Sequence, residues 1–263
     1  MSGIRIATIN TQTGRLLKDP DGLHIFARRL VDVLLLQEVF GTKKSAIDRR
    51  LRMDGYRLVA FNQSTGLAIA ILIDSELSIL QNSVKLAILQ ESGRVAKLMV
   101  RKNLISGHHV RERGALMLEV RTTKGQKIVV ATTHPAVFIR HRSRTEHLRL
   151  LHQYLTTTYH VSQPLLLGAD MNHYPGPGRF DIAFRERGGF KEVPIGDTTW
   201  SVTGTKYEQL ARIAARLSRQ QLSAFNGRLD TILYRGAAVR HLETQIIPIA
   251  SDHRAIISYF SLP

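Results

Sequence analysis

The stretch that decides the fold begins with IVVATTH at residues 128–134 and ends with PLLLGADMN at residues 164–172. Both segments are short apolar runs of the kind that form buried strands. Between them, apolar residues recur at helical spacing over residues 143–155. A strand, a helix and a second strand in this order form a parallel pair. We therefore expect His134 and Asp170 to lie side by side at the carboxyl ends of two neighbouring strands.

The same unit occurs near the start of the chain. IRIATIN at residues 4–10 and VLLLQE at residues 33–38 read as strands, with a helix predicted over residues 21–31 between them. They end in Asn10 and Glu38. Ligands of open α/β sheets bind at the carboxyl ends of such strands, so these polar ends predict a site.

Two further polar clusters adjoin strands late in the chain. Arg228-Leu-Asp230 precedes a strand predicted over residues 231–234, and Ser251-Asp252-His253 precedes one over residues 255–260. A helix is predicted from about residue 206 to residue 222. All six clusters could converge on one site.

Strands and helices alternate along the chain, which indicates an α/β protein. Residues 58–130 read as several strands with polar connections. No Pro/Gly/Ser-rich linker divides the sequence, so we expect a single domain over residues 1–263.

Composition limits the function classes. The chain has 37 Lys and Arg against 21 Asp and Glu, a net charge of 37 − 21 = +16. This excess favours an anionic partner such as nucleic acid, anionic lipid or a phosphorylated small molecule, although it could serve solubility alone. The absence of cysteine excludes a thiolate metal site and a cysteine nucleophile.

Nothing in the sequence predicts a membrane protein. The longest apolar run, Leu67 to Ile73, is far shorter than the roughly 20 residues that cross a bilayer. The first residues enter a strand pattern without a secretory hydrophobic segment. We therefore expect a cytoplasmic protein, with delivery elsewhere as an effector left open. We also expect a monomer.

The polar strand ends carry oxygen ligands and few nitrogens, which suits Mg²⁺ or Mn²⁺ better than zinc. A hard cation near a carboxylate base and an imidazole is what phosphoester hydrolysis requires. No Gly-rich phosphate loop, Gly-x-Ser-x-Gly elbow or dinucleotide fingerprint occurs. The candidate side chains are Asn10, Glu38, His134, Asp170, Asn172, Asp230, Asp252 and His253.

In this order, the clusters resemble the endonuclease/exonuclease/phosphatase superfamily. It includes pancreatic-type deoxyribonucleases, abasic-site endonucleases, inositol polyphosphate 5-phosphatases, neutral sphingomyelinases and the catalytic subunit of cytolethal distending toxin. The matching stretches span residues 6–253 and are IATIN (6–10), LLQE (35–38), RGALMLE (113–119), VATTH (130–134), GADMN (168–172), RLD (228–230) and SDH (251–253).

The resemblance implies a four-layer αββα sandwich, in which two packed mixed β-sheets are flanked by helices and the active site lies at one end. It also implies roles for individual residues. Glu38 would bind the divalent cation directly, Asn10 would help to hold it, and Asp252 would bind it or support a ligand.

The resemblance assigns the remaining residues to the phosphate and the attacking water. Asp170 would orient or deprotonate the water, and Asn172 would position it. His253, oriented by Asp230, would bind the scissile phosphate. His134 would contact phosphate or assist the leaving group, and Arg113 would contact phosphate.

Three residues depart from the family pattern. Ala169 is an extra residue in the usual Gly-Asp-x-Asn, Thr231 stands where tyrosine is common, and Ile9 stands where many members have tryptophan. These departures leave the subfamily open.

The substrate class is less constrained. Arg140 and Arg142 could clamp a phosphodiester backbone beside His134, which favours a nuclease acting on DNA. The alternative is a phosphatase or phospholipase-C-type phosphodiesterase acting on phosphoinositide, sphingomyelin or a small phosphate ester. AVFI at residues 136–139 could then touch a lipid surface. A binding module that has lost activity is a third reading.

Overall fold

The computed structural model describes most of the chain. The described residues are 2–19, 21–41, 43–90, 112–135, 141–171, 184, 189–196, 198–201, 208–209, 212–213 and 229–262.

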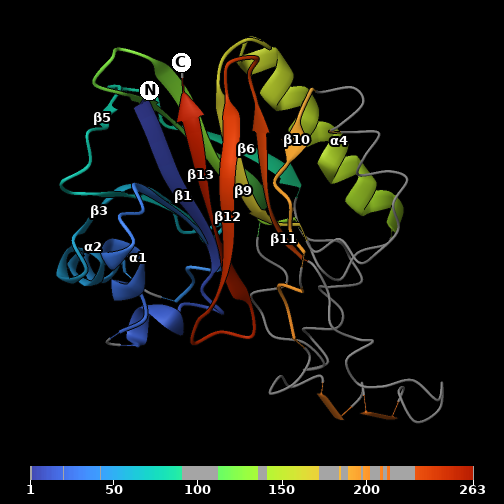
Figure 1. Ribbon diagram of the computed structural model, residues 1–263. Helices are drawn as coiled ribbons and strands as arrows, with labels where there is room; N and C mark the ends of the chain where they lie inside the picture. Colours follow the sequence, from blue (N-terminus) through green and yellow to red (C-terminus); the bar gives the residue numbers. More distant parts are fainter. Residues whose placement is uncertain are drawn as a thin grey trace.

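Two β-sheets form the body of the molecule (Figure 1). The first has the strand order β12-β13-β1-β2-β4-β3. Its strands are β1 (Ser2–Asn10), β2 (Val33–Gln37), β3 (Tyr56–Asn62), β4 (Leu67–Leu72), β12 (Arg240–Pro248) and β13 (Arg254–Leu262).

The second sheet has the order β10-β11-β9-β8-β7-β5, and β6 also pairs with β7. Its strands are β5 (Ser78–Ile79), β6 (Lys85–Gln90), β7 (Arg113–Arg121), β8 (Lys127–Thr133), β9 (Leu165–Asp170), β10 (Lys191–Glu192) and β11 (Asp230–Arg235).

Both predicted strand–helix–strand units are present. β1 runs parallel to β2, and β8 runs parallel to β9, whereas the other pairs among the described strands are antiparallel. The sheets are therefore mixed, as expected. Among the described residues, the helical segments with defined bounds are the 3₁₀ turn η1 (Leu16–Lys18) and the helices α1 (His24–Arg28), α2 (Lys44–Met53) and α4 (His141–Thr158).

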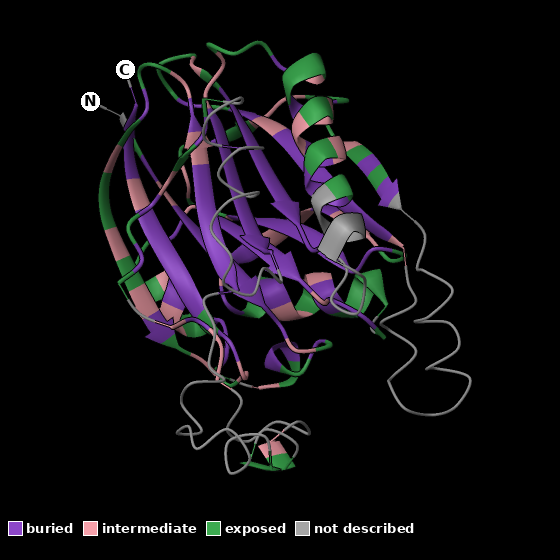
Figure 2. Ribbon diagram, turned by 90° about the vertical axis from the view of Figure 1, so that its right-hand side faces the viewer, coloured by how far each residue is buried: buried purple, intermediate pink, exposed green. Residues whose placement is uncertain are grey.

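The side chains of β1 alternate between two buried layers, because successive side chains of a strand point to opposite faces. Ile4 and Ile6 of β1 face the core between the sheets, whereas Ala7 and Ile9 face the layer beneath α1 and α2. α4 covers the second sheet with Leu148 and Leu151 and exposes its other side (Figure 2). The result is the predicted four-layer sandwich.

The sheets approach closely near the end where β1 and β9 finish. A Cβ at Gly168 would lie 2.7 Å from Leu35 Cδ1 and 2.8 Å from Thr8 Cβ, so only glycine fits there. Beside it, the buried Gln37 amide donates to the hydroxyls of Thr8 and Thr132 at 3.0 and 2.8 Å. These contacts tie the two parallel pairs together across the sandwich.

Three helix predictions need correction or fall outside the described residues. The helix predicted over 21–31 is limited to α1, because Leu30 adopts a φ of 52° and is 61% exposed rather than buried. The helix predicted over 143–155 extends over 141–158. α2 was not predicted. Only residues 208–209 and 212–213 of the helix predicted over 206–222 are described, and they are helical.

No helix in the described part of the chain combines the length and the apolar character needed to cross a membrane.

Candidate active site

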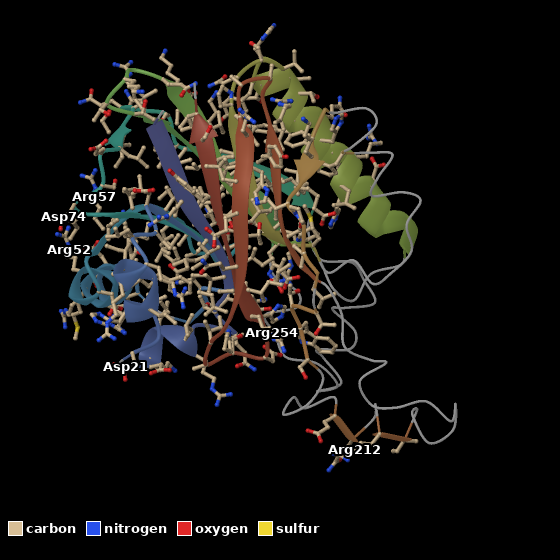
Figure 3. All side chains as sticks on the ribbon, in the orientation of Figure 1. Asp21, Arg52, Arg57, Asp74, Arg212 and Arg254 are labelled. Carbon is tan, nitrogen blue, oxygen red and sulfur yellow. The ribbon has the colours of Figure 1, made fainter. Side chains whose placement is uncertain are left out.

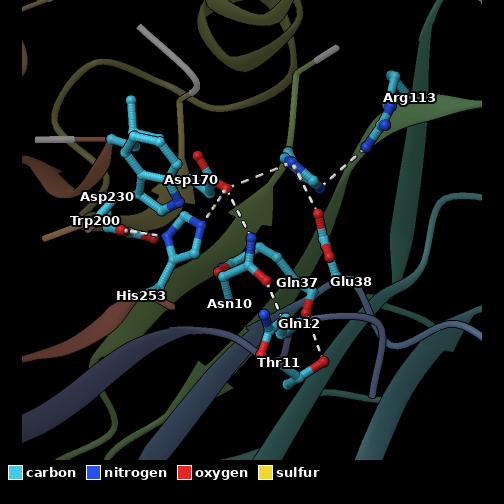
Figure 4. A network of polar contacts seen from close by, with 12 residues as sticks. Asn10, Thr11, Gln12, Gln37, Glu38, Arg113, Asp170, Trp200, Asp230 and His253 are labelled. Carbon is cyan, nitrogen blue, oxygen red and sulfur yellow. Dashed lines mark hydrogen bonds and ion pairs between the residues drawn. The ribbon is translucent and has the colours of Figure 1, made fainter. Parts of the chain in front are cut away.

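The candidate residues come together at one end of the sandwich (Figure 4). Asn10 and Asp170 are the last residues of β1 and β9, and Glu38 and His134 follow β2 and β8. β11 runs antiparallel to β9, so it begins at the same edge with Asp230. β13 likewise runs antiparallel to β1, and the residue before it is His253.

Asp170 lies at the centre of this network. Its Oδ2 accepts a 2.7 Å hydrogen bond from Asn10 Nδ2 and lies 3.8 Å from His253 Nε2. The side chain is 2% exposed. Burial raises the pKa of Asp170, and the positive charge of His253 and the Asn10 hydrogen bond offset this only in part. A carboxylate with a raised pKa can accept a proton from water.

His253 and Asp230 form a buried pair. His253 Nδ1 lies 2.7 Å from Asp230 Oδ2, which turns Nε2 of the ring toward Asp170. Burial alone would lower the pKa of His253, but the carboxylates of Asp230 and Asp170 outweigh it and raise the pKa to about 10. His253 is therefore a fixed imidazolium at neutral pH, with a charge suited to a phosphate oxygen.

Arg113 contacts His134 directly. Arg113 Nη1 lies 3.0 Å from His134 Nδ1. A guanidinium can only donate, so Nδ1 accepts and the proton of His134 resides on Nε2. That nitrogen lies 3.5 Å from Asp170 Oδ2 and 3.8 Å from Glu38 Oε1. Arg113 is 1% exposed and thus lies behind His134 rather than on an open surface.

Glu38 occupies a strained backbone position. Its φ is 57°, in the left-handed region that residues with a Cβ rarely adopt. Its Oε2 accepts a 3.0 Å hydrogen bond from the Thr13 N–H, and the side chain is 13% exposed. Burial raises the pKa of Glu38, although the charges of His253 and Arg113 lower it. A positive charge bound there would offset the cost of burial.

The donor atoms can be tested for their fit to a cation. Among the described residues, Asp170, Asp230 and His253 each offer a ligand atom, and these atoms lie within 4.8 Å of one another. However, a histidine binds metal through an imidazole nitrogen that carries no proton, and Nδ1 of His253 is already hydrogen-bonded to Asp230 at 2.7 Å. The Glu38 carboxylate is partly exposed, and burial raises its pKa. It therefore suits a hard cation better than the His253 ring does.

Asn10 meets Asp170 through its amide nitrogen. Its Oδ1 accepts a 2.9 Å hydrogen bond from the Gln12 N–H. The arrangement therefore fixes the orientation of the amide, with its donor directed to the candidate base.

Sequence reasoning missed Thr199 and Trp200. Thr199 is fully buried, and its Oγ1 accepts hydrogen bonds from the backbone of Leu229 and Asp230. Trp200 Nε1 donates to Asp252 Oδ2 at 3.3 Å. Trp200 is the single tryptophan of the chain, but only the folded structure reveals which acceptor its N–H reaches.

Three predicted residues cannot be placed at this site. Asn172 and Arg140 lie outside the described residues, and of Arg142 only the backbone, within α4, is described.

This edge of the sheets gathers buried carboxylates and two histidines, which are groups that phosphoester hydrolysis can use. The sequence matches the Endonuclease/Exonuclease/phosphatase family over residues 7–253. The chain belongs to this family, whose members are hydrolytic phosphoesterases that generally depend on a divalent metal. The resemblance inferred from the sequence is confirmed.

Solved structures with the same fold come from diverse proteins. D. rerio TDP2 complexed with a single-strand DNA product is 17% identical, with a TM-score of 0.70, covering 99% of this chain and 100% of that chain. The human Nocturnin catalytic domain with bound sulfate is 16% identical (TM-score 0.67, covering 99% and 95%). A Bacteroides thetaiotaomicron mannosyl-6-phosphatase is 15% identical (TM-score 0.65, covering 98% and 100%).

At these identities the likeness establishes the fold. No curated protein matches the sequence significantly.

Proposed function

We propose that this protein is a Mg²⁺- or Mn²⁺-dependent phosphodiester hydrolase that acts on nucleic acid, with DNA as the first candidate substrate. The observation that carries the proposal is the placement of Asp170 between the His253–Asp230 pair and His134. The net charge of +16 supports a polyanionic substrate. TDP2, which shares the fold, was solved with a DNA product.

Asp170 is the proposed base. Asn10 holds one of its oxygens, and burial favours its protonated form, so the carboxylate takes a proton from the water that attacks phosphorus. The positively charged ring of His253 binds a non-bridging oxygen of the scissile phosphate. Asp230 keeps that imidazolium charged and oriented throughout.

Glu38 is the proposed principal ligand of the cation, supported by Asp252 and by Asn10 at the end of β1. When bound, a hard divalent cation polarises a phosphoryl oxygen and neutralises developing charge. Glu38 is suited to this role because its carboxylate is partly exposed and lies at the same edge as Asp170.

His134 is the proposed donor to the phosphate or the leaving oxygen. Arg113 keeps its Nδ1 in the accepting form, so Nε2–H faces the centre of the site. In this proposal Arg113 does not contact the phosphate itself but orients His134, which does. We also propose that Asn172 positions the water and that Arg140 and Arg142 contact the substrate backbone.

The test is a substrate panel with Mg²⁺ or Mn²⁺: plasmid DNA, single-stranded and abasic oligonucleotides, RNA, phosphoinositide and sphingomyelin vesicles, and a sugar phosphate. We expect DNA cleavage that a chelator abolishes. Asp170→Asn or His253→Gln should reduce the rate by about 10² to 10⁴, the usual contribution of one acid or base.

Asp74→Asn is the matched control. Asp74 is an exposed carboxylate well apart from Arg254, the neighbour of His253 (Figure 3). This variant should cleave DNA at the wild-type rate. DNA left intact by the wild-type protein with every metal tested would contradict the proposal.

The second candidate is a phosphatase or phosphodiesterase for small phosphate esters or phospholipids. The observation in its favour is that the mannosyl-6-phosphatase shares the fold, with a TM-score of 0.65. Phosphate release from a sugar phosphate or a lipid, with intact plasmid in the same buffer, would select this candidate.

We propose in addition that residues 1–263 form one domain and act as a monomer. Light scattering coupled to size-exclusion chromatography would measure the mass directly, and 29.6 kDa is expected.

A further inference from the structure

A short segment of three residues, Thr199 to Ser201, lies against the candidate site. Its backbone pairs with the loop that carries Asp252 and His253. Ser201 N donates to Asp252 O at 3.1 Å, and Arg254 N donates to Thr199 O at 2.7 Å. Trp200 and His253 form a bridge between these hydrogen bonds. The segment therefore fixes the backbone on both sides of His253.

The same segment also fixes the start of β11. The buried hydroxyl of Thr199 accepts hydrogen bonds from Leu229 N and Asp230 N, both at 3.0 Å. One short segment thus holds the two strands that supply Asp230 and His253. Its backbone contacts account for the place of the segment in the fold, but not for the choice of tryptophan.

The Trp200 side chain reaches the carboxylate of Asp252. Nε1 donates to Asp252 Oδ2 at 3.3 Å, and Ser251 Oγ lies 3.4 Å from the other oxygen, Oδ1 (Figure 4 shows Trp200 beside Asp230 and His253). Indole is a donor only, so this contact requires an accepting oxygen. Asp252 is partly exposed, so the contact orients its carboxylate without sealing it from the site.

Asp252 lies close enough to Glu38 for their charges to interact. Ser251, the residue before Asp252, donates from its hydroxyl to Asn10 O at 3.2 Å, and Asn10 pairs with Gln37, the residue before Glu38. The negative charge of Asp252 acts on Glu38 across this edge. A divalent cation bound to Glu38 would therefore also be attracted by the negative charge of Asp252. Groups that orient the carboxylates of a metal site change the metal affinity when they are removed.

We propose that Trp200 is a positioning residue for the metal site, because its indole N–H sets the orientation of the Asp252 carboxylate toward a cation at Glu38. This inference rests on the proposed function for the presence of the cation. It has a spectroscopic consequence. Trp200 is the single tryptophan, so the tryptophan fluorescence of the whole protein reports on the environment of Asp252.

The test measures Mn²⁺ affinity from the electron paramagnetic resonance signal of free Mn²⁺. The proteins are the wild type, Trp200→Phe, Asp252→Asn and the double variant. Trp200→Phe keeps an aromatic ring but removes the N–H, and we expect its Kd for Mn²⁺ to rise about tenfold or more. In the Asp252→Asn background the same change should alter the Kd less than about twofold. The reason is that Trp200 is expected to act on the metal only through the Asp252 carboxylate, which this background lacks.

Tyr259→Phe serves as the control. It removes a polar group from another aromatic ring, one that stacks on Arg5 rather than contacting the site, and it should leave the Kd unchanged. An unchanged Kd in Trp200→Phe would overturn the inference. So would an equal loss in the presence and absence of the Asp252 carboxylate.

A wild-type protein that binds no Mn²⁺ would count against the proposed function instead. Should Trp200→Phe fail to fold, fluorescence of the wild type decides. Its emission should change saturably with Mg²⁺ and should not respond in Asp252→Asn. No response in a wild type that binds Mn²⁺ would also overturn the inference.

Discussion

Glu38 has a φ of 57°, and this left-handed conformation costs a residue with an unbranched side chain about 1 kcal/mol or more. Asparagine adopts it more readily. We predict that Glu38→Asn raises the free energy of unfolding by about 1 kcal/mol. The same change should abolish metal-dependent hydrolysis. Urea denaturation and a hydrolysis assay measure the two effects.

Glu38→Gln is the matched control, because it removes the charge but retains a side chain that suffers the same strain. It should lose activity without the full gain in stability. If Glu38→Asn proves no more stable than Glu38→Gln, the backbone at this position is not strained as described.

The His253–Asp230 pair predicts a pH dependence of stability. The pKa of His253 is raised to about 10 from an ordinary value of 6.5, so the folded state binds the proton more tightly than the unfolded state. The stabilisation is complete below pH 6.5 and is lost as the pH rises through about 10. Burial raises the pKa of Asp170 from 3.8 to about 7, which also makes stability fall with rising pH, but between those two lower values.

The measurement is the free energy of unfolding by urea at several pH values from about 6.5 to about 10. We expect it to fall with rising pH in the wild type and to fall less in His253→Gln. His160→Gln, at an exposed position, should retain the wild-type slope. Parallel curves for the wild type and His253→Gln would rule out this source of stability.

Sequence reasoning singled out the polar residues that end apolar strands. Glu38 has little structural reason to follow such a run, and Asp170, which could also form a turn, repeats the same pattern. Sequence reasoning could not find the contacts that depend on tertiary packing. Arg113 was expected at the phosphate, and only the folded chain shows that it holds His134. Trp200 belongs to no motif in the sequence, and the residue that it contacts, Asp252, lies 52 residues further along the chain.

At the scale of the elements, β9 lies in close contact with β1 and β2 at Gly168. An alanine Cβ would lie within 2.7 Å of Leu35 and 2.8 Å of Thr8, and the Thr8 Cβ cannot swing aside. We predict that Gly168→Ala destabilises the protein by about 1–3 kcal/mol, the usual cost of overpacking. It should also reduce hydrolysis, because Asp170 lies two residues further along β9.

Gly196→Ala is the control, since a Cβ there meets nothing within 4 Å among the described residues. Thermal unfolding compares the two variants. Equal stability of Gly168→Ala and the wild type would show that the sheets can separate at this end without cost.

Elements with a continuous apolar run were predicted well, whereas helices with weak patterns were not. β2 is buried at all five positions, and its short apolar run therefore predicts a buried strand clearly. α2 buries only Ile47 and Leu51 within a strongly polar segment, and this pair is too sparse to stand out. α1 was overextended because the apolar Leu30 fits the helical period but lies exposed in a turn.

At the scale of the whole molecule, the charge of +16 predicts how a nucleic acid would bind. Each phosphate neutralised releases counterions, so the logarithm of the association constant falls by about 0.9 per contact with the logarithm of salt concentration. We predict this steep dependence for duplex DNA and the inactive Asp170→Asn variant, measured by fluorescence anisotropy. A nearly salt-independent affinity would indicate a small uncharged contact area.

The four-layer sandwich was predicted from the resemblance to the family and not from the periodicity of apolar residues. The sequence pattern predicted two parallel pairs but could not show that they belong to different sheets packed face to face. That arrangement depends on side chains such as Gln37, which reaches Thr132 in the other sheet. Sequence separation hides such contacts until the chain is folded.

The central claim is a single divalent-cation site at Glu38, on the edge where Asp170 and His253 meet. The most direct measurement is anomalous X-ray scattering from crystals soaked in Mn²⁺. We predict one peak bonded to the Glu38 carboxylate and its loss in Glu38→Gln. A peak centred instead among Asp170, Asp230 and the His253 ring, or no peak at this edge, would contradict the account.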